Sequence, residues 1–363
     1  MNKPDRIAIF LGHPAHYHMF KNTVRQLEHE GIEVDYVIKR KDIVEELVIR
    51  SKHRYYVIRD HERKAKGKIG LATALIAMEI KMIAYILKRR PKLVIGTYAP
   101  ILSHLTGVPF IVCCEDDTSV VPRFAKTSYP YATAILAPIY CDGGRWNDKM
   151  TKYAGFQKLA YLHPNYFTPN RDIIEPHLRN KDKPFVLMRF AKLQAHHDDG
   201  IGGLSSQVAE HLVDILSSKY DIYISSERTL EPKLEPFRLR INPLDIHHWL
   251  AYADLYIGDS QSMAVEAAML GTPSIRYSDF AKRIGVLNEL ENRYRLTTGI
   301  PTNQPEKLYQ TVSMMIETEK LKEQYQSRRS VMLAEQIDVS QFFTDFIRKQ
   351  LCSISHQKNT LNS

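Results

Sequence analysis

Short apolar runs alternate with amphipathic stretches through the first half of the chain. The runs predict strands at residues 6–11, 33–38, 55–58, 92–95, 109–113 and 132–137. Helices are expected between them at 16–30 and 69–87, with a short one that ends at Gly107. Because strands that alternate with helices form a parallel sheet covered on both faces, this half is predicted to be a doubly wound domain.

The same alternation begins again after an irregular segment. Residues 151–180 lose the periodicity and contain prolines at 164, 169 and 176, which is typical of a passage between domains. Strands are then predicted at 184–189, 221–225, 238–241, 254–257 and 274–276, with helices at 204–217, 244–252 and 260–270. A charged helical stretch at 305–334 and a last helix at 339–352 follow, and residues 353–363 are expected to form a frayed tail.

The predicted fold class is therefore α/β, with two Rossmann-like domains in tandem. A length of 363 residues suits two domains. The expected boundaries are an N-terminal domain at 1–160, an interdomain linker at 161–180, a C-terminal domain at 181–335, and a C-terminal helix and tail at 336–363.

The amino-acid composition excludes some classes of protein but does not identify a binding partner. Hydrophobic residues make up 44% and charged residues 25%, which excludes a disordered chain or a coiled-coil rod. A net charge of +9 is compatible with polyanions, anionic membranes and phosphorylated small molecules. Four cysteines without CxxC spacing favour a reducing cytoplasm, and the apolar run at 7–11 is too short for a signal peptide.

Residues 69–87 have nearly the length of a membrane span. Glu79 and Lys81 lie within this stretch, so a helix buried against the sheet is favoured over a spanning one. Its flanks at 63–68 and 88–90 are basic, which leaves a peripheral contact with an anionic leaflet, at the inner membrane face, as a second possibility.

Ligands of open α/β sheets bind at the carboxyl ends of the strands, and four loops at such ends carry candidate chemistry. The first reads Gly12-His13-Pro14-Ala15-His16, where a glycine lets a ligand approach the backbone and a helix N-terminus favours an anion or a polar sugar group. Gly12 and His13 are candidate binding residues and His16 a candidate base. The alternative is a turn with solvated histidines, and no metal site is predicted because no acid accompanies them at matched spacing.

The second loop is Glu115-Asp116-Asp117, after the strand at 109–113. Three neighbouring carboxylates repel one another, which raises at least one pKa and suits Glu115 or Asp116 to general-base catalysis. The alternative is that Asp117 or Thr118 caps the next helix.

The third loop follows the strand at 184–189 and contains Arg189, Lys192, His197 and Asp198. Arginine and lysine can neutralise a diphosphate, and a histidine beside an aspartate can move a proton. A binding role is predicted for Arg189, Lys192 and Asp198, and a catalytic one for His197.

The fourth loop precedes the helix at 260–270. Serines in the first turn of a helix offer free N–H groups and a favourable dipole to phosphate, and a glutamate further along can accept hydrogen bonds from ribose hydroxyls. The candidate binding residues are Gly258, Asp259, Ser260, Gln261, Ser262 and Glu266. The alternative for Glu266 is a capping carboxylate or a solvated face.

The segment from Gly258 to Pro273 resembles the nucleotide-sugar signature of the GT-B superfamily, in which a Gly/Ser-rich turn opens a helix, a glutamate follows, and a Leu-Gly-Thr-Pro turn leads into a strand. Over about residues 5–345 the chain resembles an uncharacterised GT-B-like family of archaeal and bacterial proteins. In that family Gly-His-Pro-Ala-His, Ala-His-His-Asp and Gly-Asp-Ser-Gln-Ser-Met-Ala-Val-Glu-Ala-Ala recur. The resemblance implies two Rossmann-like domains that face each other across a cleft.

The chain is also distantly similar to non-hydrolysing UDP-N-acetylglucosamine 2-epimerases. Glu115, His197, Asp259-Ser260 and Glu266 occur in the order of the epimerase motifs. Gln261-Ser262 stand where the epimerases have two glycines, and their His-Arg-Arg-Glu-Asn string is missing. These departures favour the broader class of glycosyltransferases.

The leading hypothesis is a metal-independent glycosyltransferase of polysaccharide or glycolipid assembly. A nucleotide-sugar, expected to be a UDP-sugar, is the donor substrate, no separate cofactor is expected, and the acceptor is a carbohydrate or a lipid-linked molecule. Ser260 and Ser262 would hold the diphosphate and Glu266 the ribose.

The same hypothesis assigns the remaining chemistry. Arg189, Lys192 or His197 would stabilise the leaving phosphate. Glu115 or Asp116, with His16 as an alternative, would deprotonate the acceptor hydroxyl.

Two other functions are weighed against this hypothesis. The first is an epimerase or hydrolase in which Glu115, Asp116 and His197 handle the proton at C2 of the sugar and the departing phosphate. The second is a non-catalytic basic binding module, although no nucleic-acid-binding motif is present and no nucleic-acid partner is expected.

Overall fold

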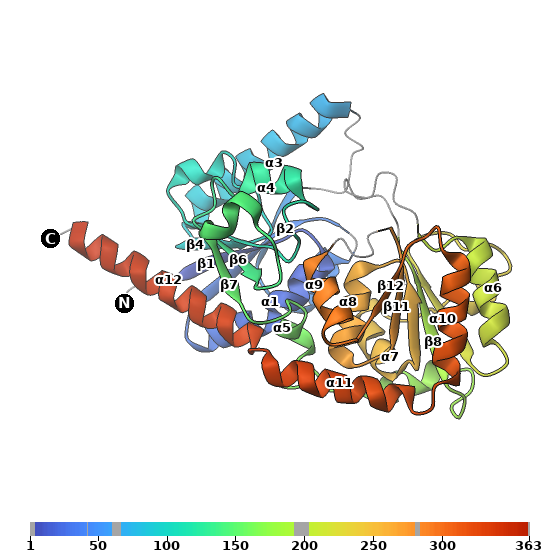
Figure 1. Cartoon of the computed structure of the whole chain (residues 1–363). Coiled ribbons are helices and arrows are strands. Elements are labelled where there is room, and N and C mark those ends of the chain that lie inside the picture. Colours follow the sequence, from blue (N-terminus) through green and yellow to red (C-terminus); the bar gives the residue numbers. More distant parts are fainter. Residues whose placement is uncertain (1–3, 42, 60–66, 192–202, 280–283, 362–363) are drawn as a thin grey trace. The chain divides into compact units, whose positions relative to one another are not determined.

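The chain forms two compact α/β units (Figure 1). The computed structural model describes residues 4–41, 43–59, 67–191, 203–279 and 284–361. Unit 1 comprises Met1–Tyr161 together with Ile337–Ser363, and unit 2 comprises Leu162–Gln336. Residues 162–180, expected as a linker, therefore group with unit 2, and the C-terminal helix groups with unit 1.

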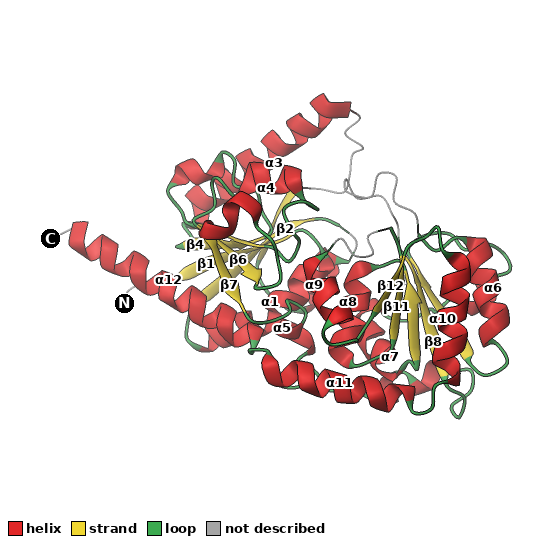
Figure 2. Ribbon diagram, in the orientation of Figure 1, coloured by secondary structure: helices red, strands yellow, loops and turns green. Residues whose placement is uncertain are grey.

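Unit 1 is built on a seven-stranded parallel sheet in the order β3-β2-β1-β4-β5-β6-β7 (Figure 2). The strands are β1 (Arg6–Leu11), β2 (Glu33–Lys39), β3 (Tyr55–Arg59), β4 (Leu93–Gly96), β5 (Phe110–Cys113), β6 (Ala134–Pro138) and β7 (Met150–Tyr153). The strand order reverses between β1 and β4, so the loops that leave these two strands flank the usual ligand position of such a sheet. The predicted strands match β1 to β6, whereas β7 was not predicted because half of it is exposed and polar.

Helices cover both faces of this sheet. They are α1 (Pro14–His29), α2 (Val44–Arg50), α3 (Gly67–Arg89), α4 (Pro122–Ser128), α5 (Leu159–Leu162) and α12 (Val339–Leu361), with a 3-10 turn η1 (Ser103–Thr106). Alternate residues of a strand point to opposite faces, and Ala8 and Phe10 of β1 pack against Met82 of α3. Within the described ranges, no helix has the length and apolar character needed to cross a membrane.

Helix α12 corrects the expectation of a frayed tail. It continues from Val339 to Leu361 through the residues predicted to be irregular. Its buried Phe343 lies 5.7 Å, between ring centroids, from Phe20 of α1. This packing against α1 gives the helix a tertiary anchor that the polar composition of its last turns did not indicate.

Unit 2 contains a five-stranded parallel sheet in the order β12-β11-β10-β8-β9. Its strands are β8 (Phe185–Phe190), β9 (Asp221–Ser226), β10 (Leu255–Gly258), β11 (Ser274–Tyr277) and β12 (Thr298–Ile300). The helices are α6 (Ser206–Leu216), α7 (Ile246–Tyr252), α8 (Gln261–Leu270), α9 (Gly285–Asn292), α10 (Pro305–Glu317) and α11 (Leu321–Glu335). The strand order reverses between β8 and β10, which puts the two loops richest in candidate residues at the usual ligand position.

Two predictions for unit 2 are wrong in detail. The strand expected at 238–241 is reduced to a single bridge between Ile224 and Arg238, because the flanking Pro236 and Pro243 leave too short a run to pair. The helical stretch expected at 305–334 is two helices, since Thr318 is extended and Lys320 adopts a left-handed conformation with φ of 53°. Short β12 and α9 were not predicted.

Candidate functional site

The loop after β1 has a glycine and two histidines in defined positions. His13 is the N-cap of α1, and its Nδ1 accepts a hydrogen bond from the N–H of Ala15 at 3.2 Å. Gly12 donates its N–H to Nδ1 of His16 at 3.2 Å. His13 therefore has a structural task as a cap, and the loop folds back on itself through His16.

His16 contacts the neighbouring strand end at the switch point of unit 1. The hydroxyl of Thr97, which follows β4, lies 3.0 Å from Nδ1 of His16. Burial lowers the pKa of His16 well below its usual range, and the charges of His13, Lys158 and Lys41 lower it further. Since Nδ1 accepts the N–H of Gly12, the neutral ring carries its proton on Nε2 and acts as a hydrogen-bond donor there.

Glu115, at the end of β5, forms an ion pair that was not predicted. Its Oε1 lies 2.5 Å from Nζ of Lys158, whose side chain is only 4% exposed. The other carboxylate oxygen, Oε2, is buried and has no hydrogen-bond partner among the described residues. Among the described residues, none therefore fills the acceptor capacity of this oxygen.

The two acids that follow Glu115 differ from it. Asp116 is partly exposed, and its carbonyl accepts a hydrogen bond from Sγ of Cys114 at 3.5 Å. Asp117 is buried and accepts the N–H of Asp142 at 2.6 Å. Asp117 therefore fastens a loop, whereas Glu115 has a buried oxygen without a hydrogen-bond partner among the described residues.

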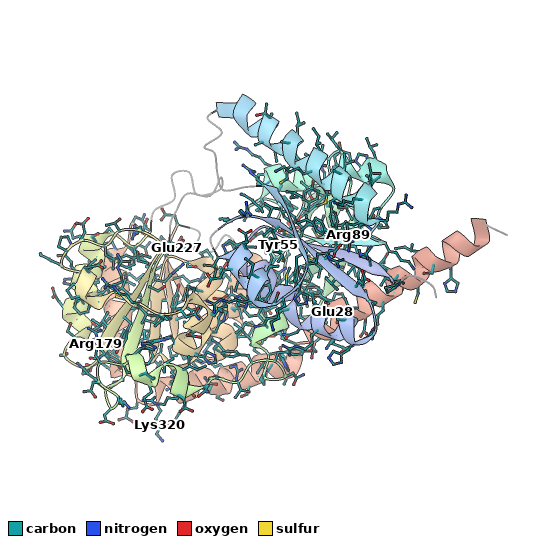
Figure 3. All side chains as sticks on the ribbon, turned by 180° about the vertical axis from the view of Figure 1, so that it is seen from behind. Glu28, Tyr55, Arg89, Arg179, Glu227 and Lys320 are labelled. Carbon is teal, nitrogen blue, oxygen red and sulfur yellow. The ribbon has the colours of Figure 1, made fainter. Side chains whose placement is uncertain are left out.

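In unit 2, Arg189 lies near the end of β8 and is directed toward β9. Its Nη1 donates to Oγ of Ser225 at 2.6 Å, and its Nη2 pairs with Glu227. Figure 3 shows Glu227 at the carboxyl end of the unit 2 strands. The guanidinium of Arg189 is thus occupied by two partners on the β9 side. The predicted residues Lys192, His197 and Asp198 lie outside the described part of the chain.

Asp259, after β10, is a buried carboxylate that holds two backbone segments. It accepts the N–H of Ala191 at 2.7 Å and the N–H of Leu204 at 3.0 Å. Burial raises the pKa of Asp259, while these two hydrogen bonds and Arg228 oppose the shift. Asp259 is therefore a positioning residue for the two backbone segments that adjoin the β8 loop.

Gly258 allows the end of β10 to lie close to the end of β8. A Cβ at this position would lie 2.9 Å from the backbone oxygen of Arg189 and 2.6 Å from the hydroxyl of Tyr256. Any larger residue would push β10 away from β8 at the switch point.

The N-terminus of α8 opens directly after Asp259. Ser260 is the N-cap, and its Oγ accepts the N–H of Met263 at 3.4 Å. The N–H groups of Gln261 and Ser262 belong to the first turn, where a helix supplies no acceptor of its own. Ser262 is exposed. The first turn of a helix is the kind of element at which backbone N–H groups can bind an anion.

Arg276, a buried residue of β11, supports that turn. Its Nη1 donates to Oε1 of Gln261 at 3.2 Å, and its Nη2 lies 2.5 Å from Oε2 of Glu291. Burial lowers the pKa of Arg276, and Glu291 opposes this effect. Gln261 therefore has a positioning role as a link between the turn and a buried cation.

Glu266 lies one turn beyond Ser262 on the same face of α8, four residues along the helix. It is buried, and its Oε1 lies 3.3 Å from Nε2 of His247 on α7. Glu266 and His247 thus place a carboxylate and an imidazole below the first turn of α8.

The structure assembles two groups of candidate residues. In unit 1 these are His16, Thr97, Glu115 and Lys158. In unit 2 they are Ser260, Gln261, Ser262, Glu266, His247 and Arg276. No group of three or more His, Cys, Asp or Glu that could hold a metal ion occurs in the part of the chain that the structure describes.

Four residues of these groups were not predicted: Thr97, Lys158, His247 and Arg276. Thr97 is a single hydroxyl after a strand and gave no signal in the sequence. Arg276 is a charged residue within a short buried strand, and this position could have indicated a residue with a specific partner. Lys158 is the charged residue of the mostly apolar segment 156–162, which the sequence pattern placed in the irregular segment between the two domains. His247 lay in the predicted helix at 244–252, for which no chemical role was proposed.

Comparisons with known proteins confirm the family and the fold. The profile of a family described as "Protein of unknown function (DUF354)" matches residues 6–300. No curated protein matches the chain in sequence. Three solved structures with the same fold illustrate its relatives.

The S. aureus MnaA–UDP co-structure aligns with a TM-score of 0.68 and 15% identity, over 96% of this chain and 97% of that chain. The UDP-GlcNAc 2-epimerase from Neisseria meningitidis bound to UDP-GlcNAc has a TM-score of 0.64 and 12% identity, over 96% and 100%. The glycosyltransferase from Rickettsia africae ESF-5 has a TM-score of 0.61 and 13% identity, over 96% and 99%. The GT-B-like α/β fold expected from the motifs is thereby confirmed.

Proposed function

The chain belongs to the DUF354 family, and we propose that it is a glycosyltransferase that moves a sugar from a nucleotide donor to an acceptor hydroxyl. The donor is a UDP-sugar, and the acceptor is a carbohydrate or a lipid-linked molecule of polysaccharide or glycolipid assembly. The transfer requires no metal ion and no separate cofactor. Two aligned structures, MnaA and the Neisseria epimerase, contain UDP or UDP-GlcNAc, which supports a uridine donor.

The first turn of α8 carries this proposal. Ser260 caps the helix, Gln261 is held by buried Arg276, and Ser262 is exposed beside free backbone donors. A diphosphate would accept hydrogen bonds from these N–H groups and benefit from the helix dipole. The positive end of the helix would also stabilise the charge that develops on the departing nucleoside diphosphate, in place of a metal ion.

Glu266 would bind the ribose of the donor. Its position four residues after Ser262 directs both side chains along one face of α8, and nearby His247 orients the carboxylate. A carboxylate can accept hydrogen bonds from both ribose hydroxyls.

Glu115 is the proposed general base in unit 1. Its buried Oε2 would accept the proton of the acceptor hydroxyl, while Lys158 holds Oε1. The oxygen of the acceptor then forms the new bond to C1 of the sugar, the bond from C1 to the phosphate oxygen breaks, and the nucleoside diphosphate leaves. His16, whose Nδ1 already accepts a hydrogen bond, would donate from Nε2 to a substrate oxygen instead of serving as the base.

The remaining assignments rest on sequence. Asp116 adjoins Glu115 and is the alternative base. His197 and Lys192 are proposed to contact the leaving phosphate.

A nucleotide-sugar 2-epimerase is the second candidate. The observation that favours it is the same buried oxygen of Glu115, because a base confined to a buried position suits removal of a proton from carbon at C2 of the sugar. An epimerase would need no acceptor.

One experiment separates the two reactions. The protein is incubated with UDP-N-acetylglucosamine in deuterated water, with and without a carbohydrate acceptor, and the sugar is analysed by NMR. A transferase releases UDP only when acceptor is present and leaves C2 unlabelled. Deuterium at C2 in the absence of acceptor would identify the epimerase.

The variant Glu115→Gln tests the base in either case. We expect a loss of about 10²- to 10⁴-fold in kcat, the usual contribution of a general base, with EDTA having no effect on the wild type. Exposed Glu319→Gln on unit 2 is the matched control and should retain full activity.

A further inference from the structure

Helix α3 exposes a continuous apolar stripe on unit 1. Ile76 is 50% exposed, Ile80 59% and Leu87 66%, and Ala84 between them is also exposed. Spacings of four, four and three residues keep these side chains on one face of the helix. We call these four residues the α3 stripe.

The adjacent turn η1 and the residue that precedes it add two more apolar side chains. Leu105 is 76% exposed and Leu102 39%. Glu79 of α3 accepts the backbone N–H groups of Ile101, Leu102 and Ser103 at 3.1, 3.2 and 2.8 Å, which fastens η1 against the helix. The α3 stripe together with Leu102 and Leu105 is called the apolar patch below.

Basic residues accompany the apolar patch. Lys81 and Lys88 are exposed and lie one position beyond Ile80 and Leu87, so they follow the same edge of the stripe. Arg90 is exposed just past the helix. Residues 67–90 contain one acidic residue, Glu79, and it is buried and directed to η1. The exposed border of the patch is therefore positively charged.

The N-terminal half of α3, which includes Ile76, extends away from the rest of unit 1 (Figure 1). Its buried side, with Met78, Met82 and Tyr85, packs on the sheet and forms the core. The exposed apolar side chains are therefore not needed to form the core of unit 1. Exposed apolar patches of this kind mark interaction sites.

We propose that the apolar patch docks unit 1 on the surface of an anionic phospholipid membrane. The isoleucines and leucines would enter the boundary between headgroups and acyl chains, while Lys81, Lys88 and Arg90 meet the lipid phosphates. This surface lies outside both groups of site residues, so the proposal goes beyond the glycosyltransferase assignment and does not depend on it.

Charge favours lipid over a second copy of the chain. Two copies joined through this patch would bring their rows of basic residues together, and like charges across an interface oppose association. An anionic leaflet offers the opposite charge to the same residues.

The test is sedimentation of the full chain with vesicles. Vesicles of equal parts phosphatidylglycerol and phosphatidylcholine are compared with vesicles of phosphatidylcholine alone. We expect binding to the anionic vesicles that weakens as salt is added. The double variant Ile80→Asp/Leu105→Asp should lower the partition coefficient at least about tenfold, because it removes two apolar contacts and adds two repelled charges.

Control variants test whether the loss of vesicle binding is specific to the apolar patch. Ile49→Asp replaces an isoleucine of α2 that is 56% exposed and lies outside the patch, and it should bind like the wild type. Lys88→Gln should weaken binding about fivefold, the value of one basic charge near an anionic leaflet. Lys307→Gln on α10, an exposed lysine of unit 2, should have no effect.

Three results would overturn the proposal: absence of binding to the anionic vesicles, equal binding by the double variant, or a dimer in sedimentation velocity that Ile80→Asp dissolves. The last would assign the patch to a second copy of the chain. Thermal shifts with UDP on the same variants keep this test apart from the proposed enzymatic function.

Discussion

Glu115 and Lys158 are the residues in unit 1 whose contact most constrains the chemistry. Lys158 is only 4% exposed and lies 2.5 Å from Oε1 of Glu115, so each charge is stabilised in part by the other. Removing one member of a buried pair costs more than the pair contributes, because the remaining charge is left in a medium of low dielectric constant.

The variant Lys158→Met is therefore expected to lower the free energy of unfolding by about 3 kcal/mol. The double variant Lys158→Met/Glu115→Gln should lose less than the sum of the two single variants. Urea unfolding monitored by circular dichroism measures all three. Additive losses would show that the two side chains do not form the described pair.

His16 predicts a pH dependence of stability. Burial keeps its folded pKa well below 6.5, whereas the unfolded chain titrates near 6.5. Between these two values the unfolded state binds more protons, so stability is retained above pH 6.5 and falls as the pH decreases below it, by up to about 1.4 kcal/mol per pH unit.

The variant His16→Asn isolates this contribution, since the asparagine oxygen can still accept the N–H of Gly12. Its unfolding free energy should fall less between pH 7 and pH 5 than that of the wild type. Exposed His29→Asn is the control and should keep the wild-type slope. Identical slopes for His16→Asn and the wild type would contradict the assignment.

At the scale of elements, Gly96 decides how closely β4 approaches β1 at the switch point. It has φ of 148°, and a Cβ there would lie 2.5 Å from the backbone oxygen of Phe10. Gly31, after α1, has φ of 82° with no atom within 4 Å of such a Cβ. Both glycines have positive φ, but only Gly96 would bring a Cβ into a steric clash. Alanine variants at the two positions therefore distinguish the cost of the backbone conformation from the cost of the clash.

Gly31→Ala should cost about 1 kcal/mol through its conformation alone. Gly96→Ala should cost at least about 3 kcal/mol, because strain in the backbone and displacement of β1 add together. Thermal midpoints of the two variants measure the difference. Equal midpoints would mean that β4 can move away from β1 without cost.

Most elements could be predicted because their periodicity and end residues agree. The strand at 6–11 and the helix ended by Gly271 match β1 and α8, since uniform apolar runs and a left-handed glycine cap are local properties. The same holds for the first turn of α8, which the serines identified.

The residues that support the site could not be predicted in the same way. Lys158 is separated from Glu115 by 43 positions, and Arg276 from Gln261 by 15. Such contacts depend on tertiary packing, which no local pattern reports. For the same reason sequence patterns could not show that Asp259 holds Ala191 and Leu204, or that Arg189 turns toward Glu227.

At the scale of the whole molecule, the two units have different tasks in the proposed reaction. In that proposal the first turn of α8 in unit 2 would bind the nucleotide and Glu115 in unit 1 would serve as the base, while the apolar patch of unit 1 serves the separate proposal of membrane docking. Each task can be removed without the others, because the residues that serve them lie on separate elements. The central claim is that a nucleoside diphosphate binds at α8.

The most direct test of this claim is the thermal midpoint of the full chain with UDP, GDP, CMP, dTDP, ADP and their sugar conjugates. At about a hundredfold excess over Kd, the wild type should gain about 5 °C with UDP and UDP-sugars. Glu266→Gln, compared with its own ligand-free midpoint, should lose most of this gain, and Glu319→Gln should retain it. Ser262→Ala keeps the backbone N–H groups and should lose only the smaller part that its hydroxyl contributes. A wild type that gains nothing with any nucleotide, or a Glu266→Gln variant that gains as much as the wild type, would contradict the account.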